Sequence, residues 1–321
     1  MTDLSIIIVN HNTKDLLRDC LASLREHLAR PVCEVFVVDN GSKDGSTAMV
    51  RQELPWVELI ENTGNLGFAR ANNQAIRRAS GSFVLLLNSD TIINKGAIEG
   101  LLETMQSDPS IGVAGLQLLN GDGSLQNSIY NFPSLLTELT NKSLLRRLFP
   151  NRYRGKEQRI LQPIEVDGII GSCMLVRKEA IKEIGLLDED YFFFFEETDW
   201  CLRMRRAGWK VIFDPRYTIF HLQGKSAAKV NARARIEYWR SRYTYFEKHF
   251  DAISCHILRV GLLARLAAEI CLLAIAGFAS LGRAAKSQQK LAVNTAILQW
   301  HMRGRPPEGG LQSASNSLKS L

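Results

Sequence analysis

Short apolar runs alternate with longer segments of helical periodicity through the first two thirds of the chain. Residues 4–9, 35–38, 57–60, 83–87 and 113–119 are dominated by Ile, Val, Leu and Phe. Runs of this length with few polar breaks are typical of strands that are buried on both faces in a parallel sheet. The segments between them place apolar residues three and four positions apart, which predicts amphipathic helices. The pattern therefore predicts an α/β fold with a mostly parallel, Rossmann-like sheet flanked by helices.

The same two patterns continue to residue 221 and then change. Strands are expected at residues 166–177, 211–213 and 218–220. Helices are expected after a cap at Asn12 or Thr13, at 46–54, after the turn at 62–67, after a cap at Asn94 that leads to Ser107, at 178–184 and at 197–206. We therefore divide the chain into an α/β domain at 1–222, a C-terminal helical region at 223–303, and a disordered tail at 304–321 that is rich in Pro, Gly and Ser.

Three of the predicted strands end in polar clusters. The sequence is Asn-His-Asn at residues 10–12, Asp-Asn-Gly-Ser at 39–42 and Asn-Ser-Asp at 88–90. Ligands of open α/β sheets bind at the carboxyl ends of the strands, and Asn88 and Asp90 are spaced so that both can face one ligand. Asn, Ser and Asp are also common turn residues. Taken alone, the third cluster fits a turn as well as a binding site.

A glycine-containing turn at residues 62–67 opens one of the predicted helices. It contains Asn62, Gly64, Asn65 and Gly67. Helix N-termini that follow such turns bind phosphate or ribose well. The spacing is not Gly-x-Gly-x-x-Gly, so the dinucleotide-binding fingerprint is absent.

An acidic and aromatic run at residues 188–200 supplies further candidates for chemistry. Glu197 begins a predicted helix there, and His221 follows a short apolar strand. With Asp90, such a histidine makes a mixed oxygen and nitrogen site suited to Mn²⁺ or Mg²⁺ holding a diphosphate. A histidine in this position is also commonly a packed or hydrogen-bonded residue. A carboxylate near an acceptor hydroxyl is suited to act as a general base.

The net charge of +7 is concentrated in the last third of the chain. Residues 225–305 contain 14 Lys or Arg and 4 Asp or Glu, a net charge of +10, so the remainder is slightly acidic. This asymmetry indicates contact with a polyanion or an anionic membrane surface. We favour the membrane surface and expect no nucleic-acid partner. Residues 120–163 are loop-rich and locally basic, which fits either a solvated loop or one that faces a substrate.

Residues 256–285 are strongly apolar. Their longest uncharged stretch, 270–282, has 13 residues, whereas a membrane-spanning helix needs about 20. Charged residues at 259, 265, 269 and 283 fall on one side of a helix, which predicts a helix that lies in a membrane interface. A buried packing helix or a homodimer contact is the alternative.

The cysteines and the N-terminus favour a reduced, cytoplasmic protein. None of the six cysteines forms a Cys-x-x-Cys pair, so a zinc site is not indicated. The N-terminus has no basic segment, and its apolar run is too short for a signal peptide. With the basic helical region, this predicts peripheral association at the cytoplasmic face of the inner membrane.

The motifs together resemble a known family. Residues 1–222 are similar to family 2 glycosyltransferases of the GT-A fold, particularly to bacterial rhamnosyltransferase-like members that build surface polysaccharides. The resemblance lies in residues 9–12, 38–42, 62–73, 87–90, 171–177 and 195–203 and in His221. Each motif alone is weak, but their order and spacing make the set specific.

The resemblance implies a role for each matching residue. It implies a donor site with Asp39 at the nucleotide base, and an acceptor region. The donor site would comprise Asn10, Asn12, Asp39, Asn62, Gly64, Asn65, Gly67, Asn73 and Asn88, and the acceptor region Gly171, Arg177 and Glu196.

The metal and the base are also implied by the resemblance. Asp90 matches the last residue of the Asp-x-Asp metal motif, whose first position is Asn88 here, and His221 matches a second ligand of the Mn²⁺ or Mg²⁺ ion. Glu197 stands where the family usually has an Asp as catalytic base, so Asp199 is kept as an alternative.

The implied activity is metal-dependent, inverting transfer of a sugar from a nucleotide-sugar to a hydroxyl of a glycan or lipid-linked acceptor. The subgroup points to dTDP-rhamnose as the donor. Two other functions stay open, a sugar nucleotidyltransferase and a non-catalytic nucleotide-sugar binding protein. The phosphate-binding loop of a nucleotidyltransferase would normally follow the first strand, where residues 10–12 stand instead.

Overall fold

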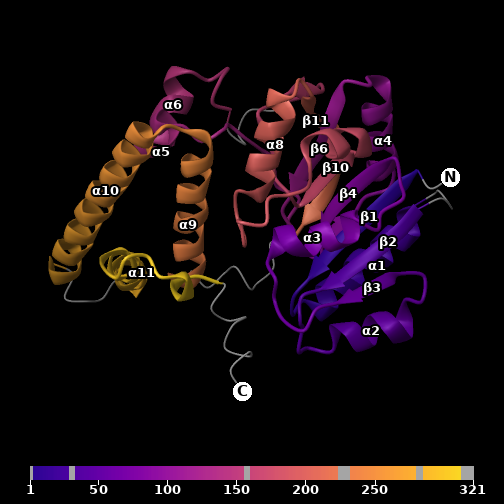
Figure 1. The fold of residues 1–321 in the computed structure, drawn as a ribbon, viewed down its shortest axis with the longest axis horizontal. Helices are drawn as coiled ribbons and strands as arrows, with labels where there is room; N and C mark the ends of the chain where they lie inside the picture. Colours follow the sequence, from indigo (N-terminus) through magenta and orange to yellow (C-terminus); the bar gives the residue numbers. More distant parts are fainter. Residues whose placement is uncertain (1–2, 29–32, 155–159, 223–231, 280–284, 312–321) are drawn as a thin grey trace.

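The computed structural model describes residues 3–28, 33–154, 160–222, 232–279 and 285–311. These residues form a nine-stranded mixed sheet between helices, with a group of C-terminal helices beside it (Figure 1). The strands of this sheet are β1 (Leu4–Asn10), β2 (Cys33–Asp39), β3 (Glu58–Glu61), β4 (Phe83–Asn88), β5 (Thr91–Ile93), β6 (Ile111–Leu119), β8 (Ile164–Glu165), β10 (Cys173–Arg177) and β11 (Lys210–His221). The predicted α/β class and the C-terminal helical extension are confirmed.

The sheet changes direction halfway across. Its order is β3-β2-β1-β4-β10-β6-β11-β5, and β8 pairs with β11. Strands β3, β2, β1 and β4 are parallel, whereas β10 is antiparallel to both β4 and β6. β1 lies between β2 and β4, and helices pack on both faces of the sheet, so Ile6, Ile7 and Ile8 have no solvent exposure. Burial of each such side chain contributes about 1.5–3 kcal/mol, which explains the unbroken apolar runs in the sequence.

Helices cover both faces of the sheet. One face packs against α1 (Lys14–His27), α2 (Ser46–Glu53) and α4 (Ala97–Ser107), and the other against α3 (Phe68–Ile76), α7 (Lys178–Ile184) and α8 (Glu196–Arg206). A small second sheet pairs β7 (Ile129–Tyr130) with β9 (Gly168–Ile169).

Three sequence-based boundaries were wrong. The expected strand at residues 166–177 is divided, since β9 belongs to the small sheet and β10 to the large one. The expected strands at 211–213 and 218–220 are one strand, β11, whose register shifts between Asp214 and Thr218 around Pro215, a residue that cannot donate to the ladder. The helix expected after Asn94 begins at Ala97, because the Asn94 side chain donates to the Thr218 hydroxyl instead.

The C-terminal helices form their own apolar core. It joins α9 (Ala232–His249), α10 (Ala252–Ala279) and α11 (Ala285–Met302) and includes Tyr191 and Phe195 from the loop before α8. Two short helices, α5 (Leu135–Leu139) and α6 (Lys142–Leu148), lie beside them, and α5 packs on α10 (Figure 1). Among the described residues, no helix is long and apolar enough to cross a membrane.

The start of the predicted tail is ordered against α9. Residues 304–311 contain a 3₁₀ turn at Pro307–Gly309, and Arg240 donates to the carbonyl oxygen of Pro307 at 2.6 Å. The backbone N–H of Leu311 donates to Glu237. Disorder was therefore the wrong prediction for residues 304–311, and the rest of the predicted tail lies outside the described residues.

Candidate active site

The parallel strands bring their polar ends together. Asn10 at the end of β1 is the register partner of Asp39 at the end of β2, and Val9 is the partner of Asn88 on β4. The Asn10 side-chain amide donates to Asp39 Oδ1 at 2.8 Å, and the backbone N–H of Ser42 donates to Asp39 Oδ2 at 2.8 Å. Asp39 is buried, so a nucleotide base that binds it would use the remaining lone pairs of the two oxygens.

A network of side-chain amides fixes the glycine-containing turn against β2. Asn62 donates to Asn40 at 2.9 Å and exchanges hydrogen bonds with Gln74, while Asn65 accepts from the backbone N–H of Gly67. Asn40 also donates to Asn65. The turn that was predicted to contact the nucleoside is therefore preorganised.

Two backbones approach closely at this turn. Gly41 has a φ of 72°, and a Cβ added there would lie 2.7 Å from the Cα of Gly64. Both the left-handed conformation and the missing side chain are thus required at Gly41. This contact explains why the Asp-Asn-Gly-Ser cluster and the turn at residues 62–67 occur together.

Asn12 and Asn73 differ in their solvent exposure and in their hydrogen-bond partners. Asn12 is exposed, with a φ of 55°, and its Oδ1 accepts from the backbone N–H of Lys43. Asn73 is buried and bonded to both backbone groups of Leu187 and to Glu189. The side chain of Asn73 thus fastens α3 to the loop before α8, and these bonds occupy both its amide nitrogen and its amide oxygen. Its place in the donor site stays a prediction.

Asp90 and His221 meet at one edge of the strand ends. Asp90 Oδ1 and His221 Nε2 are 3.2 Å apart, and both side chains are mostly buried. His221 Nδ1 lies 2.9 Å from Gln126 Oε1, an acceptor, so Nδ1 carries a proton and Nε2 is the nitrogen that faces Asp90. Asn88 donates to Ser172 Oγ at 3.3 Å, and this hydroxyl is also 3.3 Å from His221 Nε2.

Glu196 and Glu197 begin α8 beyond a strained turn. Phe194 and Phe195 have φ values of 74° and 71°, which bulky residues rarely adopt and which cost on the order of 1–2 kcal/mol each. Glu196 is 4% exposed, whereas Glu197 is half-buried. Oε2 of each is buried without a hydrogen-bond partner among the described residues.

The environment of Glu197 favours its neutral form. Burial raises the pKa of Glu197, while backbone N–H groups at the start of α8 and at Gly171 act in the opposite direction. Burial and the neighbouring Glu197 also raise the pKa of Glu196. Gly171 lies against the Glu197 side chain: a Cβ added to Gly171 would be 3.7 Å from the Cβ of Glu197. The 171–172 segment therefore connects Glu197 with the Asp90–His221 pair.

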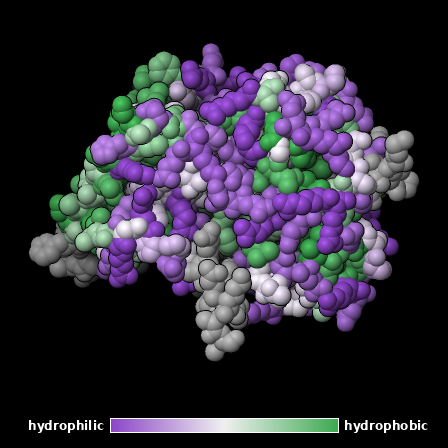
Figure 2. All heavy atoms as spheres, in the orientation of Figure 1, coloured by the Kyte–Doolittle hydropathy of each residue, from purple (hydrophilic) through white to green (hydrophobic). Residues whose placement is uncertain are grey.

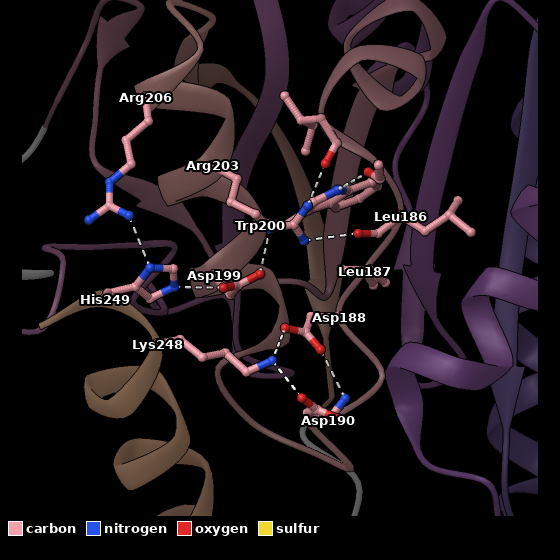
Figure 3. A network of polar contacts seen from close by, with 12 residues as sticks. Leu186, Leu187, Asp188, Asp190, Asp199, Trp200, Arg203, Arg206, Lys248 and His249 are labelled. Atoms are coloured by element: carbon pink, nitrogen blue, oxygen red, sulfur yellow. Dashed lines mark hydrogen bonds and ion pairs between the residues drawn. The ribbon is translucent and has the colours of Figure 1, made fainter.

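Asp199 belongs to a structural network instead (Figure 3). Its carboxylate accepts from Arg203 Nε and from His249 Nε2, both at 2.7 Å. Arg203 also donates to the carbonyl oxygens of Ile184 and Leu186, and Lys248 pairs with Asp188 and Asp190. Although burial raises the pKa of Asp199, the hydrogen bond from His249 and the charge of Arg203 bring it below its ordinary value. Asp199 thus links α8 to α9.

Arg177 lies apart from the other predicted acceptor residues. It pairs in register with Phe83 at the start of β4, whereas Cys173 pairs with Leu87 near the end that carries Asn88. Its guanidinium donates to the carbonyl oxygens of Ile111, Met105 and Asp108. Because five residues of extended strand separate it from the site, its assignment to the acceptor region is corrected.

Several residues of the site gave little signal in the sequence. Gln126, Ser172 and Ser42 hold His221, Asn88 and Asp39, respectively. Ser42 and Ser172 stand inside predicted motifs, so proximity to Asp39 and Gly171 was a usable signal. Gln126 comes from a loop 95 residues before its partner, and no local pattern marks it.

The sheet and site together define a GT-A glycosyltransferase. Its strand ends hold a carboxylate–histidine pair and a glycine-containing turn, and the half-buried Glu197 lies beside Gly171 at the N-terminus of α8. The family model for glycosyl transferase family 2 matches residues 5–185, and the chain belongs to this family.

Individual relatives agree with this assignment. The N-acetylglucosaminyl-diphospho-decaprenol L-rhamnosyltransferase of Mycobacterium tuberculosis is 30% identical over 263 residues, which cover 76% of this chain and 84% of the relative. The low-salt glycan biosynthesis hexosyltransferase Agl10 of Haloferax volcanii is 31% identical over 215 residues, 64% of this chain and 62% of the relative. The predicted resemblance to rhamnosyltransferases is thereby confirmed.

A solved structure shows the same fold. The mannosyltransferase PcManGT from Pyrobaculum calidifontis, in complex with GDP-Man and Mn²⁺, has a TM-score of 0.57 at 17% identity. The match covers 94% of this chain and 86% of that chain, so it extends beyond the α/β domain.

Proposed function

We propose that this glycosyltransferase is a metal-dependent, inverting enzyme that transfers a sugar from a nucleotide-sugar to a hydroxyl of a glycan or lipid-linked acceptor. The observation that carries the proposal is the Asp90–His221 pair at the strand ends, with Glu197 reached through the 171–172 segment. The pair supplies a place for a donor diphosphate, and Glu197 supplies a base for the acceptor.

The residues present fit a divalent cation. Oδ1 of Asp90 and Nε2 of His221 are 3.2 Å apart, close to the separation of about 3.0 Å between neighbouring ligands of an octahedral ion with bonds of about 2.1 Å. Gln126 holds the histidine in the tautomer that a metal requires. No group of three or more metal-ligating side chains occurs among the described residues, so the other ligands would come from the diphosphate and water. A bound Mn²⁺ or Mg²⁺ would neutralise charge on the departing nucleoside diphosphate.

Glu197 then takes the proton from the acceptor hydroxyl. The oxygen forms its bond to the anomeric carbon from the face opposite the diphosphate, which inverts the configuration. Asn10, Asn12, Asp39, Asn88 and the turn that contains Asn62, Gly64, Asn65 and Gly67 hold the donor. Gly171 and Glu196, which lie beside Glu197, belong to the acceptor region. The mycobacterial relative is named as an L-rhamnosyltransferase, which supports rhamnose as the sugar. The proposal of dTDP-rhamnose as the donor rests on the family resemblance alone.

Donor screening tests this function. A panel of nucleotide-sugars with Mn²⁺ should reveal one that raises the melting temperature, since a ligand at 100 times its Kd stabilises a protein by about 2.7 kcal/mol. That donor should then release nucleoside diphosphate when an acceptor is added, with inversion at the anomeric carbon by NMR. Release of pyrophosphate from a nucleoside triphosphate and a sugar phosphate would indicate a nucleotidyltransferase instead. Donor binding without any turnover would indicate a binding protein.

His221→Ala should weaken metal binding more than donor binding. Loss of one of two protein ligands is expected to raise the Mn²⁺ concentration for half-maximal activity at least about tenfold, with a smaller change in the donor KM. Metal titrations at saturating donor measure this. A metal titration identical to that of the native protein would exclude His221 as a ligand.

We further propose that the enzyme binds an anionic membrane surface peripherally, at the cytoplasmic face where lipid-linked acceptors are reached. One face of α10 packs in the C-terminal core through Leu258, Leu262 and Leu266. Its other face leaves apolar residues in solvent, and green side chains line this outer edge in Figure 2. The most exposed of them are Ile253, Leu272 and Ile275.

Substitutions on the exposed face should therefore release the protein from membranes. We expect the full chain to sediment with anionic liposomes at low salt and less at high salt, because basic residues and buried apolar groups both contribute. Leu272→Gln combined with Ile275→Gln should lower binding, whereas Met302→Gln, an exposed residue at the end of α11, should not. A chain that ignores anionic liposomes and forms a dimer that the same pair dissociates would show that α10 is an oligomer contact.

A further inference from the structure

A small cavity lies between the β7–β9 sheet and the two short helices. Its volume is about 130 Å³, and its lining residues come from three segments. They are Asn127, Ile129, Tyr130 and Asn131 on the first segment, Thr137, Lys142, Leu145 and Arg146 on α5 and α6, and Tyr153 and Arg154 beyond them. A second cavity of about 380 Å³ shares Ile129, Tyr130, Asn131 and Arg154 with it. The two cavities are therefore adjacent.

The smaller cavity is cationic. Lys142, Arg146 and Arg154 line it, and no carboxylate does. Lys142 pairs with Glu138 at 3.5 Å, and Glu138 is shared with Arg242. Within the described residues, neither Arg146 nor Arg154 forms an ion pair with a carboxylate. Two guanidiniums without such a partner, beside the side chains of Asn127, Asn131 and Tyr153, are suited to bind a phosphate or diphosphate through paired N–H groups.

Helix α6 presents opposite chemistry on its two faces. Lys142, Leu145 and Arg146 face the cavity, whereas Leu144 and Leu148 are 52% and 59% exposed. Phe149, at the end of the helix, is 53% exposed. A cationic cavity and an exposed apolar surface thus lie on the two sides of one short helix. A free sugar phosphate has no apolar group that could contact that surface, whereas a lipid-linked diphosphate has its lipid chain.

Tyr130 joins this cavity to the candidate active site. Its ring packs on Gly168, where an added Cβ would lie 2.3 Å from it. Its hydroxyl is buried next to Thr198 and Cys201 on α8, and burial together with the nearby Cys201 and Glu197 raises the pKa of Tyr130. The side chain of Tyr130 therefore lines the cavity and also reaches the N-terminal half of α8, which carries Glu197.

We propose that this cavity binds the diphosphate of a lipid-linked acceptor, with the lipid chain on Leu144, Leu148 and Phe149 and the acceptor sugar directed toward Glu197. This inference rests on the proposed transferase function and adds the site that recognises its acceptor. The mycobacterial relative is named for a diphospho-decaprenol substrate, which supports the same acceptor class here.

Binding of farnesyl diphosphate to the full chain tests the cavity independently of catalysis. Calorimetry should show binding to the native protein and at least about tenfold weaker binding to Arg146→Gln and Arg154→Gln, since each loses charge-assisted hydrogen bonds. Arg147→Gln is the matched control, because Arg147 is exposed on the same helix and does not line the cavity. Leu148→Ser should weaken the binding of farnesyl diphosphate and leave the binding of inorganic pyrophosphate unchanged.

Three outcomes would overturn the proposal. Equal losses in Arg147→Gln would reduce the effect to general surface charge. Equal affinity for inorganic pyrophosphate and farnesyl diphosphate would show that the lipid chain does not contribute to binding. Equal affinity for farnesol and farnesyl diphosphate would show that the diphosphate does not contribute.

Kinetics separate this inference from the proposed function. With a diphosphate-linked lipid acceptor, Arg146→Gln and Arg154→Gln should raise the acceptor KM about tenfold and leave the donor KM unchanged. The same variants should match the native enzyme on a neutral alkyl glycoside of the same sugar. An equal loss on the alkyl glycoside would contradict the cavity's role, whereas the absence of any transfer by the native protein would contradict the function and leave the calorimetric result to decide the cavity.

Discussion

Replacing Glu197 with Gln is expected to lower turnover by about 10²- to 10⁴-fold while donor binding persists, because the amide cannot accept the proton of the acceptor hydroxyl. Glu197 is half-buried and lies against Gly171, so Gln fills the same space. Steady-state kinetics and donor binding by calorimetry measure the two effects. Glu197→Asp, which restores the residue usual in the family, should recover part of the activity.

Asp199→Asn provides the contrast. This residue is bonded to Arg203 and His249, so its amide should lower thermal stability and have a smaller effect on turnover. If Asp199→Asn lowered turnover by the amount expected of Glu197→Gln while Glu197→Gln kept normal turnover, the catalytic base would be Asp199 and not Glu197.

The pH profile gives a second test of Glu197. The base must be deprotonated, and burial raises its pKa above the ordinary value of 4.5. Turnover should therefore fall with decreasing pH through this raised pKa, at a higher pH than an ordinary glutamate would give. The fall should be absent from the residual activity of Glu197→Gln.

Asp90→Ala is expected to remove metal-dependent transfer. Stabilisation of the leaving diphosphate by a metal is worth several kcal/mol, which corresponds to roughly 10²- to 10³-fold in rate. Asp90 follows β4 and its side chain is outside the apolar core, so the melting temperature should change little. Rate assays with Mn²⁺, and with EDTA as a control, test this directly. Full activity in EDTA, or in the variant, would exclude a metal role for Asp90.

The parallel half of the fold was predictable because its signal is local. Buried strands such as β1 and β4 must be apolar on both faces, and their ends must be polar where the chain turns. The same rule gave Asn10, Asp39 and Asp90 as candidates. The Glu197 hypothesis came instead from the family resemblance, together with the position of this residue at the start of a predicted helix.

The remaining features depend on contacts between distant residues. Asn73 looks like part of the turn motif, yet its partners are 114 and 116 residues away, and they occupy its amide. Arg177 ends a motif whose first residues reach the site, but an extended strand carries it to the other end of the sheet. The sequence marked residues 120–163 as basic and left a substrate-facing loop open, but it did not predict the cavity, because the lining residues come from three separate segments of that range.

The network around Asp199 crosses the boundary between the α/β domain and the C-terminal helices. The C-terminal helices therefore cannot simply be exchanged between family members by joining two chains at residue 222. Helix α8 carries the glutamates at one end and is tied to His249 of α9 in its first turns, while Lys248 reaches back to Asp188 and Asp190 (Figure 3). A chimera that takes its C-terminal helices from another family member would break these pairs unless the recipient loop matched. Specificity can therefore be recombined in this enzyme only when the loop at 188–199 travels together with α9.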